Sequence, residues 1–369
     1  MTIKHILLFL CVLLFTVPSA SFAADEVFII SQQGFIQGSL TYQSWTSSGK
    51  TVISEFSTPV FFYYPLGKNT SLSAYTSLAS AGGDSLRSLT GLGDIQSTLN
   101  YYVESLNMKF SLGLNLPTGK KAISMEEFGT LYLLSLNMYR FQTPSFGQGL
   151  NLSPGLSWAI PAGERWVLGL GGSYQLRGSF TPFEGMVKKY DPGDEWMVTG
   201  GFDFQASERT LVTADLLYSA YSEDRIGGQE IFLAGDKKVV NVQVKHRLQS
   251  STLSLLFKYR SRDKNQIAIA GGMLPEDQKT IPDEFQAAGR YRFQWGKRRI
   301  PVQITAEISH FQKTAAFHAA QIFALGITPE FLLAGGSRIP VTAKLSFGRY
   351  GESTDLFGFE LGLTWIYSL

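Results

Sequence analysis

The sequence predicts an all-β protein, a transmembrane antiparallel β-barrel of about 16 strands, with 14 as the alternative number. Three observations lead to this prediction. The chain is rich in glycine (37 of 369 residues) and 44% of its residues are hydrophobic, yet no apolar run after residue 23 is long enough for a spanning helix. Polar connectors divide the rest into stretches in which apolar and polar residues loosely alternate. The final strand carries aromatic residues on every second position, which suits a wall with lipid outside and water inside.

The amino terminus predicts a secretory signal over residues 1–23. A basic start precedes the apolar run Ile6–Phe15, and small residues up to Ala23 form the expected cleavage site. The apolar run is shorter than the ~20 residues that a spanning helix needs. We therefore expect residues 24–33 to be a short periplasmic leader and residues 34–369 to form a single barrel.

Cys11 is the only cysteine and lies in the predicted signal. The mature chain is then expected to have neither a thiol nor a disulfide, which excludes most zinc and thiol chemistry. We expect no metal and no cofactor. The 32 basic and 30 acidic residues leave a net charge of +2, so no nucleic-acid partner is implied.

The connectors between the predicted strands alternate between short and long. Residues 65–69 and 161–165 are typical short ones, whereas 80–91, 117–147 and 263–283 are long. A barrel of hairpins shows this rhythm when its turns face the periplasm and its loops face outward. An even number of strands then places both chain ends in the periplasm.

Two irregular segments decide between 16 and 14 strands. These are residues 34–46 and residues 318–334, and Pro329 interrupts the second. A soluble β-sandwich of several domains is the alternative architecture.

Alternation along the predicted strands also assigns the two faces. Arg290 and Arg292 lie opposite a face that contains Phe285 and Tyr291, and an arginine in lipid near midplane would cost about 2–4 kcal/mol. They are therefore expected to face the lumen. Three neighbouring strands together form what we call the basic wall, which consists of Lys245, Arg247, Lys258, Arg260, Arg262, Arg290 and Arg292. The expected acidic partners are Asp203, Asp215 and Glu307. Two interpretations remain open: ion pairs that brace the barrel, or a field that favours anionic solutes.

The long connector 117–147 has a spacing typical of a helix over residues 125–141. Its apolar positions are Met125, Phe128, Leu131, Tyr132, Met138 and Tyr139. Because an apolar helix in water is unfavourable, we expect it to pack into the barrel mouth as a lid that also offers an apolar landing site for ligands. The alternative is that this stretch merely extends the strands.

The last strand has Trp365, Tyr367 and Leu369 on one face and Gly362 on the other. This order resembles the carboxy-terminal signal of bacterial outer-membrane barrels, which implies recognition by the barrel-assembly machinery. We therefore expect a location in the outer membrane, with lipid and lipopolysaccharide as partners.

Two glycine-rich segments carry a resemblance to a known group. Residues 91–94 read GLGD, and residues 112–119 read LGLNLPTG. This pair resembles the outer-membrane channels associated with phenol and aromatic-compound degradation operons, the MetA-pathway group, which are distant relatives of FadL-type fatty-acid channels. The resemblance covers residues 91–178 and implies passive uptake of small hydrophobic or amphipathic compounds. The long amino-terminal hatch of FadL-type channels has no counterpart in residues 24–33.

Two other functions remain as alternatives. The first is a barrel without transport that interacts through its surface loops. The second is an outer-membrane lipid-modifying enzyme, which would need a serine and a histidine on the same face. Ser309 and His310 are adjacent in a predicted strand and point to opposite faces, so no enzymatic activity is expected.

Overall fold

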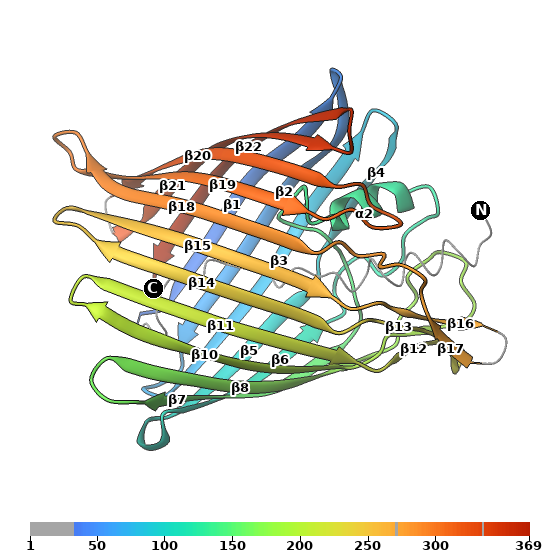
Figure 1. Ribbon diagram of the computed structural model, residues 1–369, viewed down its shortest axis with the longest axis horizontal. Helices are drawn as coiled ribbons and strands as arrows, with labels where there is room; N and C mark the ends of the chain where they lie inside the picture. The colour runs from blue at the N-terminus through green and yellow to red at the C-terminus, as the bar shows by residue number, and fades with distance from the viewer. Residues whose placement is uncertain (1–32, 270–271, 334–335) are drawn as a thin grey trace.

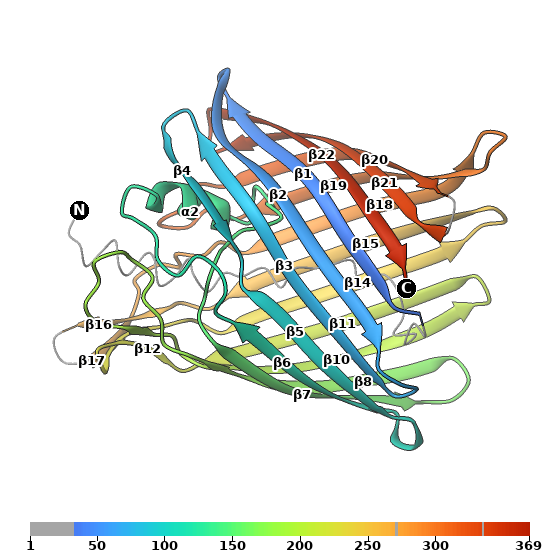
Figure 2. The ribbon, with the colours of Figure 1, turned by 180° about the vertical axis from the view of Figure 1, so that it is seen from behind.

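The computed structural model describes residues 33–269, 272–333 and 336–369. The predicted signal and nearly all of the predicted leader lie outside this part. Seventeen strands form one antiparallel sheet, but β4 (Leu86–Leu92) and β5 (Ile95–Val103) both pair with β3 (Thr70–Gly83) and share a single position. β1 (Phe35–Ser47) pairs with β22 (Thr354–Ser368), so the sheet closes into a barrel of 16 positions (Figures 1 and 2). The prediction of 16 strands is confirmed.

The remaining strands follow one another around the wall. They are β2 (Lys50–Pro65), β6 (Met108–Leu116), β7 (Asn151–Pro161), β8 (Trp166–Arg177), β10 (Glu195–Ser207), β11 (Thr210–Tyr221), β14 (Lys237–Arg247), β15 (Ser251–Arg262), β18 (Glu284–Trp295), β19 (Ile300–Phe311), β20 (Ala320–Leu332) and β21 (Arg338–Tyr350). The helices are the short η1 (Glu104–Leu106) and α2 (Phe128–Ser135). Within the described residues, no helix has the length and apolar character needed to cross a membrane.

Both irregular segments are strands. β1 pairs with both neighbours, although its ladder to β2 skips Ser39 and Leu40, and β20 continues through Pro329. The ladder between β20 and β21 skips Thr328 and Pro329, because proline has no N–H to donate, and resumes at Glu330. The ladder to β19 on the other side is unbroken through Pro329.

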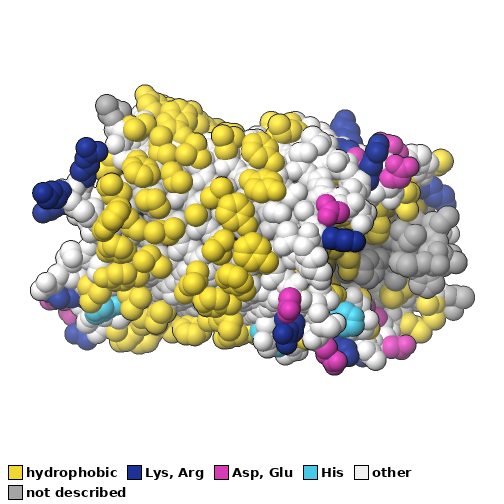
Figure 3. All heavy atoms as spheres, turned by 90° about the horizontal axis from the view of Figure 1, so that it is seen from above, with side chains coloured by type: hydrophobic (Ala, Val, Ile, Leu, Met, Phe, Trp, Pro, Cys, Tyr) yellow, Lys and Arg dark blue, Asp and Glu magenta, His cyan; other side chains and the backbone are white. Residues whose placement is uncertain are grey.

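The outer surface is apolar and the inner surface is polar. Leu363, Trp365 and Tyr367 are all at least 40% exposed on β22, although each is large and apolar. Figure 3 shows such side chains covering the barrel wall, with the charged side chains gathered toward its two ends. A closed sheet with this exterior is an outer-membrane β-barrel, because lipid is the solvent that such a surface requires.

The two ends of the barrel differ. Short turns close the end at which the chain stops, whereas the other end carries the long connectors (Figure 1). Three of these connectors build a second antiparallel sheet, which the alternation did not predict. We call it the outer sheet, and its strands are β9 (Tyr190–Asp191), β12 (Glu223–Ile226), β13 (Gln229–Leu233), β16 (Gln266–Ile269) and β17 (Gly272–Pro275). It has a small core of its own around Tyr190 and Phe232.

One predicted loop is wrong. Residues 80–91 were expected to be a long connector, but β3 continues to Gly83 and β4 begins at Leu86, so the two strands meet in a tight turn. The serine and glycine content of this segment hides its alternation, in which Ala81 and Leu89 both face the core. The hairpin extends the wall beyond the start of β5, because β4 pairs with β3 where β5 no longer does.

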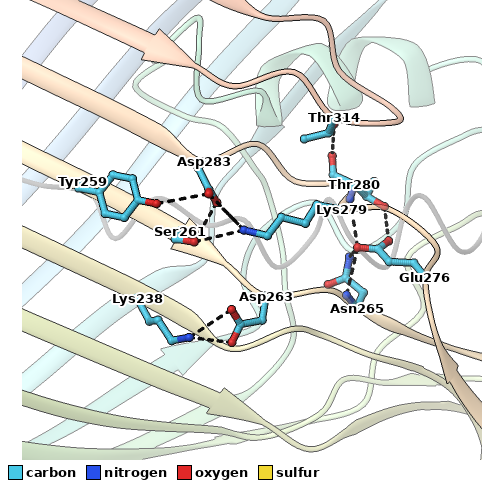
Figure 4. A network of polar contacts seen from close by, with 10 residues as sticks. All are labelled: Lys238, Tyr259, Ser261, Asp263, Asn265, Glu276, Lys279, Thr280, Asp283 and Thr314. Atoms are coloured by element: carbon cyan, nitrogen blue, oxygen red, sulfur yellow. Dashed lines mark hydrogen bonds and ion pairs between the residues drawn. The ribbon is translucent and has the colours of Figure 1, made fainter.

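A polar network ties the connector 263–283 to the barrel (Figure 4). Asp283 accepts hydrogen bonds from Tyr259, at 3.3 Å, and Ser261, at 2.9 Å, and it pairs with Lys279 at 3.0 Å. Thr314, from the next connector, donates to the carbonyl oxygen of Thr280 at 3.0 Å. These contacts fix the outer sheet to the rim of the wall.

Candidate functional site

The connector between β6 and β7 folds into the barrel. We call residues 117–150 the internal loop. Its apolar side chains join inward residues of β1–β4 and β19–β22 in one core. The loop contributes Leu131, Leu134, Met138, Tyr139, Phe141 and Phe146, and the wall contributes among others Trp45, Ile53, Leu89, Phe311, Ile322 and Leu356. One side of the lumen is therefore filled by the loop, and the opposite side, β5 to β18, is left to polar side chains.

A single carboxylate holds both ends of the internal loop. Asp94 accepts hydrogen bonds from the backbone N–H of Gly119 at 2.8 Å and of Gln148 at 2.7 Å. It also accepts from the amide of Asn115 at 2.8 Å. At Gly119 a Cβ would lie 2.7 Å from the carbonyl oxygen of Leu92, so only glycine fits here. The GLGD and PTG segments thus meet in space as the base of the loop.

The start of α2 is fixed by reciprocal hydrogen bonds. Glu127 accepts from the backbone N–H of Ser124 at 2.9 Å, and its own N–H donates to the Ser124 hydroxyl at 3.3 Å, so the arrangement of a capping box closes the turn that leads into α2. Lys120 also pairs with Glu127 at 2.6 Å. Burial works against the charged carboxylate, but the hydrogen bonds from Lys120 and Ser124 outweigh it and lower the pKa of Glu127 below its usual value.

The predicted helix is too long. Residues 125–141 were expected to be helical, whereas α2 covers only Phe128–Ser135, and Leu136 already has an extended backbone. After this point the chain makes one more local turn, in which the N–H of Tyr139 donates to the carbonyl oxygen of Leu136 at 3.1 Å, and then bonds to the wall. The carbonyl oxygen of Tyr139 accepts from Gln43 and, at 3.2 Å, from Trp45.

The predicted lid residues are placed in the lumen, but most are covered. Leu131, Met138 and Tyr139 are buried at 5% exposure or less, and Phe128 and Tyr132 are half-buried. Met125 alone is largely exposed, at 52%. Their apolar surface therefore serves to hold the loop against the wall and leaves little for a ligand to contact.

Arg140 connects the internal loop with β18 and β19. Its guanidinium donates to the hydroxyl of Ser309 at 2.6 Å and lies 3.3 Å from Glu307 and 3.5 Å from Glu284. Its backbone has φ of +53°, a left-handed conformation that costs energy for a residue with a side chain. The predicted lumenal carboxylate Glu307 is thus a partner of the loop.

The strand register places all seven residues of the basic wall on the inner face. On β15, Lys258, Arg260 and Arg262 alternate with Phe257 and Tyr259, which are exposed on the outside. Cross-strand pairing then sets Lys245, Arg247, Arg290 and Arg292 on the same inner face. Both Asp203 and Asp215 also face inward, on β10 and β11.

The contacts of the basic wall differ from those expected. Arg260 pairs at 3.0 Å with Glu284, which also contacts Arg140, and Arg292 pairs at 3.3 Å with Glu330. Asp203 instead accepts from the Thr213 hydroxyl at 2.7 Å. Within the described part of the chain, no carboxylate pairs with Lys245 or Lys258.

Sequence reasoning missed a second charged cluster, which belongs to the same inner face. Glu195, 5% exposed, pairs with Arg177 and, at 3.0 Å, with Lys237. Arg177, Lys237 and Arg262 all lie over the aromatic ring of Tyr221. Arg262 approaches most closely, at 4.9 Å from the ring centre. Glu195 is the first residue of β10, and extending the alternation of Trp196 and Val198 by one residue places it inward.

Arg177, Glu195 and Lys237 border a cavity of about 310 Å³ on the open side of the lumen. Most of its lining residues carry amide, hydroxyl or charged groups: Gln96, Ser97, Thr98, Asn115, Gln148, Asn151, Ser153, Gln175, Arg177, Glu195 and Lys237. Leu114, Phe180, Pro192 and Met197 supply apolar surface. Such a lining suits water and solutes that form hydrogen bonds.

Ser309 and His310 lie on opposite faces of β19, as alternation predicted. Ser309 is buried against Arg140, whereas His310 pairs in register with the outward Phe285. They do not form a serine and histidine pair.

No family model matches the chain, and no curated protein sequence matches it. Solved structures of similar architecture include Pseudomonas aeruginosa OccK5 (OpdH), with a TM-score of 0.49 and 10% identity over 91% of this chain and 98% of that chain. OccK11 (OpdR) of the same organism has a TM-score of 0.48 and 13% identity, over 91% and 96%. A mutant of Rh. blastica porin has a TM-score of 0.42 and 13% identity, over 90% and 99%. The chain is similar to these barrels in outline, and its own closed ladder of strands defines its fold.

Proposed function

We propose that the protein is a passive outer-membrane channel for small molecules. The observation that carries this proposal is the asymmetry of the lumen. The internal loop packs against one side, and the opposite side presents the basic wall and the polar cavity. A barrel that served only as a surface support would have no need of a charged inner face crossed by a tethered loop.

The solutes we propose are small amphipathic anions, such as carboxylates of aromatic or fatty-acid-like compounds. The resemblance to the MetA-pathway group supports an apolar part, and the cations without carboxylate partners, Lys245 and Lys258, support an anionic part. Neutral hydrophobic compounds find little apolar surface to bind in the lumen, because the apolar residues of the internal loop are mostly buried.

Ion selectivity in planar bilayers tests this proposal. We expect anions to carry most of the current, and the double variant Lys245→Gln/Lys258→Gln to shift the reversal potential toward cations, because it removes lumenal charge without leaving a carboxylate unpaired. Lys68→Gln, in an exposed turn, is the control and should change nothing. Cation preference in the unmodified protein would contradict the anionic solute class, and absence of any conductance would contradict the channel.

The second candidate is a barrel that interacts through its surface. The outer sheet, with its own core, favours this function. Solute uptake by proteoliposomes separates the two, since a sealed barrel admits none.

A further inference from the structure

A buried amide beneath the internal loop has its orientation fixed by one carbonyl group. Gln43 is 3% exposed on the inner face of β1, and its Nε2 donates to the carbonyl oxygen of Tyr139. Turning the amide over would set oxygen against oxygen, so Oε1 must point away from Tyr139. In that direction Oε1 is buried and has no donor within the described residues.

The neighbour of Gln43 on β2 is a buried carboxylate. The register pairs Gln43 with Glu55, which is 1% exposed. Glu55 Oε1 accepts the backbone N–H of Thr143, in the internal loop, at 3.1 Å. Its Oε2 has no hydrogen-bond partner of good geometry in the part of the chain that the structure describes, and the Ser57 hydroxyl, which lies beside this carboxyl, is buried and unpaired in the same way. Two buried oxygens that both lack a donor therefore occupy adjacent inward positions.

The charges around Glu55 do not supply the missing partner. The groups that face it from the packed elements are Glu360, Lys344, Tyr75, Tyr139 and Arg140. Lys344 lies 2.8 Å from Glu360, the residue of β22 that pairs in register with Gln43. Arg140 is engaged with Glu284 on β18 and Glu307 on β19. The two tyrosines are neutral phenols, so no described cation pairs with Glu55.

We propose that Glu55 is a proton-binding site and that its proton latches the internal loop to the barrel wall. A protonated Oε2 donates to Gln43 Oε1 and satisfies both orphaned atoms, while Oε1 keeps the hydrogen bond from Thr143. When the proton leaves, a buried charge faces an amide oxygen. The internal loop then leaves the wall around Thr143, and water reaches the carboxylate.

A cysteine at Thr143 reports this motion without any need for transport. Thr143 is 4% exposed, so Thr143→Cys is protected while the latch is closed. We measure its alkylation by a charged maleimide from pH 5 to pH 9, in the otherwise unchanged protein and in the Glu55→Gln background. Because thiol ionisation affects both alike, the ratio of the two rates isolates the latch. Glutamine offers an N–H donor in place of the proton and keeps the latch closed.

The alkylation rate with Glu55 present, divided by the rate in the Glu55→Gln background, is expected to be near one at the acidic end. It should rise by up to about tenfold per pH unit once the proton leaves. A ratio that stays at one throughout overturns the proposal. Protection restored at high pH by calcium also overturns it, because a metal would then hold the loop. Asp215→Asn, on the far wall, is the matched control and should leave the pH dependence intact.

A reversible lock links the latch to conductance. The Ser77 and Thr143 hydroxyl groups are 2.7 Å apart, so Ser77→Cys/Thr143→Cys can be joined by oxidation. We expect the oxidised variant to lose any pH dependence of conductance, and reduction to restore it. A barrel without conductance would refute the proposed channel, and the alkylation ratio would still decide the latch.

Discussion

At the scale of the residue, Asp94 decides where the internal loop begins and ends. It accepts three hydrogen bonds, two of them from the backbone at opposite ends of the loop, and it is 5% exposed. Hydrogen bonds to a charged group are worth about 1.5–3 kcal/mol each. An entire lumenal element therefore depends on one side chain of the wall.

Replacing this carboxylate by an amide should loosen the loop while the barrel stays folded. Asp94→Asn keeps the size of the side chain but turns an N–H toward a backbone N–H, which we expect to cost about 2–4 kcal/mol of loop attachment. Trypsin should then cut faster after Lys120 and Lys121. The control is Asp84→Asn, which removes one exposed hydrogen bond at the tip of a hairpin. Equal cleavage of both variants would contradict the role of Asp94.

The sequence predicted which arginine side chains enter the lumen but not which carboxylates they pair with. Alternation alone placed Arg260 and Arg292 on the inner face, since side-chain direction in a strand depends only on local geometry. Their partners Glu284 and Glu330 were not found, because pairing depends on the register between strands that the sequence does not display.

At the scale of the element, strands were predictable and connectors were not. The repeated period of two placed Arg290 and Arg292 opposite Phe285 and Tyr291, and on β18 the latter two are exposed on the outer face. The internal loop was expected to contain a long helix, but its polar backbone bonds to the wall, a contact that no local pattern reveals. The outer sheet was missed for the same reason, since its strands are as short as the two residues of β9.

The outer sheet should respond to pH through Asp224. This carboxyl is 3% exposed and accepts from the Tyr190 hydroxyl and the Gly193 N–H, both at 2.7 Å. Burial raises its pKa to about 6 from 3.8. Because the folded form holds the proton more tightly, this stabilisation is complete below about pH 4 and is lost as the pH rises through about 6, by up to ~3 kcal/mol.

Hydrogen exchange at Phe232, in the core of the outer sheet, checks this. After correction for intrinsic rates, exchange should be slower at pH 4 than at pH 7. Asp224→Asn should remove most of the difference, whereas Asp191→Asn, an exposed position on the same sheet, should preserve it. Exchange at Phe232 that becomes slower as the pH rises would contradict the stabilisation of the outer sheet by protonated Asp224.

At the scale of the whole molecule, the two faces of the wall have different solvents. Leu112 is exposed to lipid on β6, and its neighbour Ser111 faces the lumen. We expect Leu112→Arg to lower the free energy of unfolding by about 2–4 kcal/mol and Ser111→Arg to change it far less. Folding into lipid vesicles under denaturant measures both, and equal losses would show that the two faces do not differ.

The meeting of the first and last strands has a consequence for biogenesis. The N–H of Leu369 donates to the carbonyl oxygen of Gly34 at 2.7 Å, so the seam between β1 and β22 extends as far as these two residues. A chain without β22 would leave the edges of β1 and β21 with unpaired backbone N–H and C=O groups in the bilayer. Pairing of β22 with β1 therefore removes the last exposed strand edges and gives a ring that the membrane tolerates.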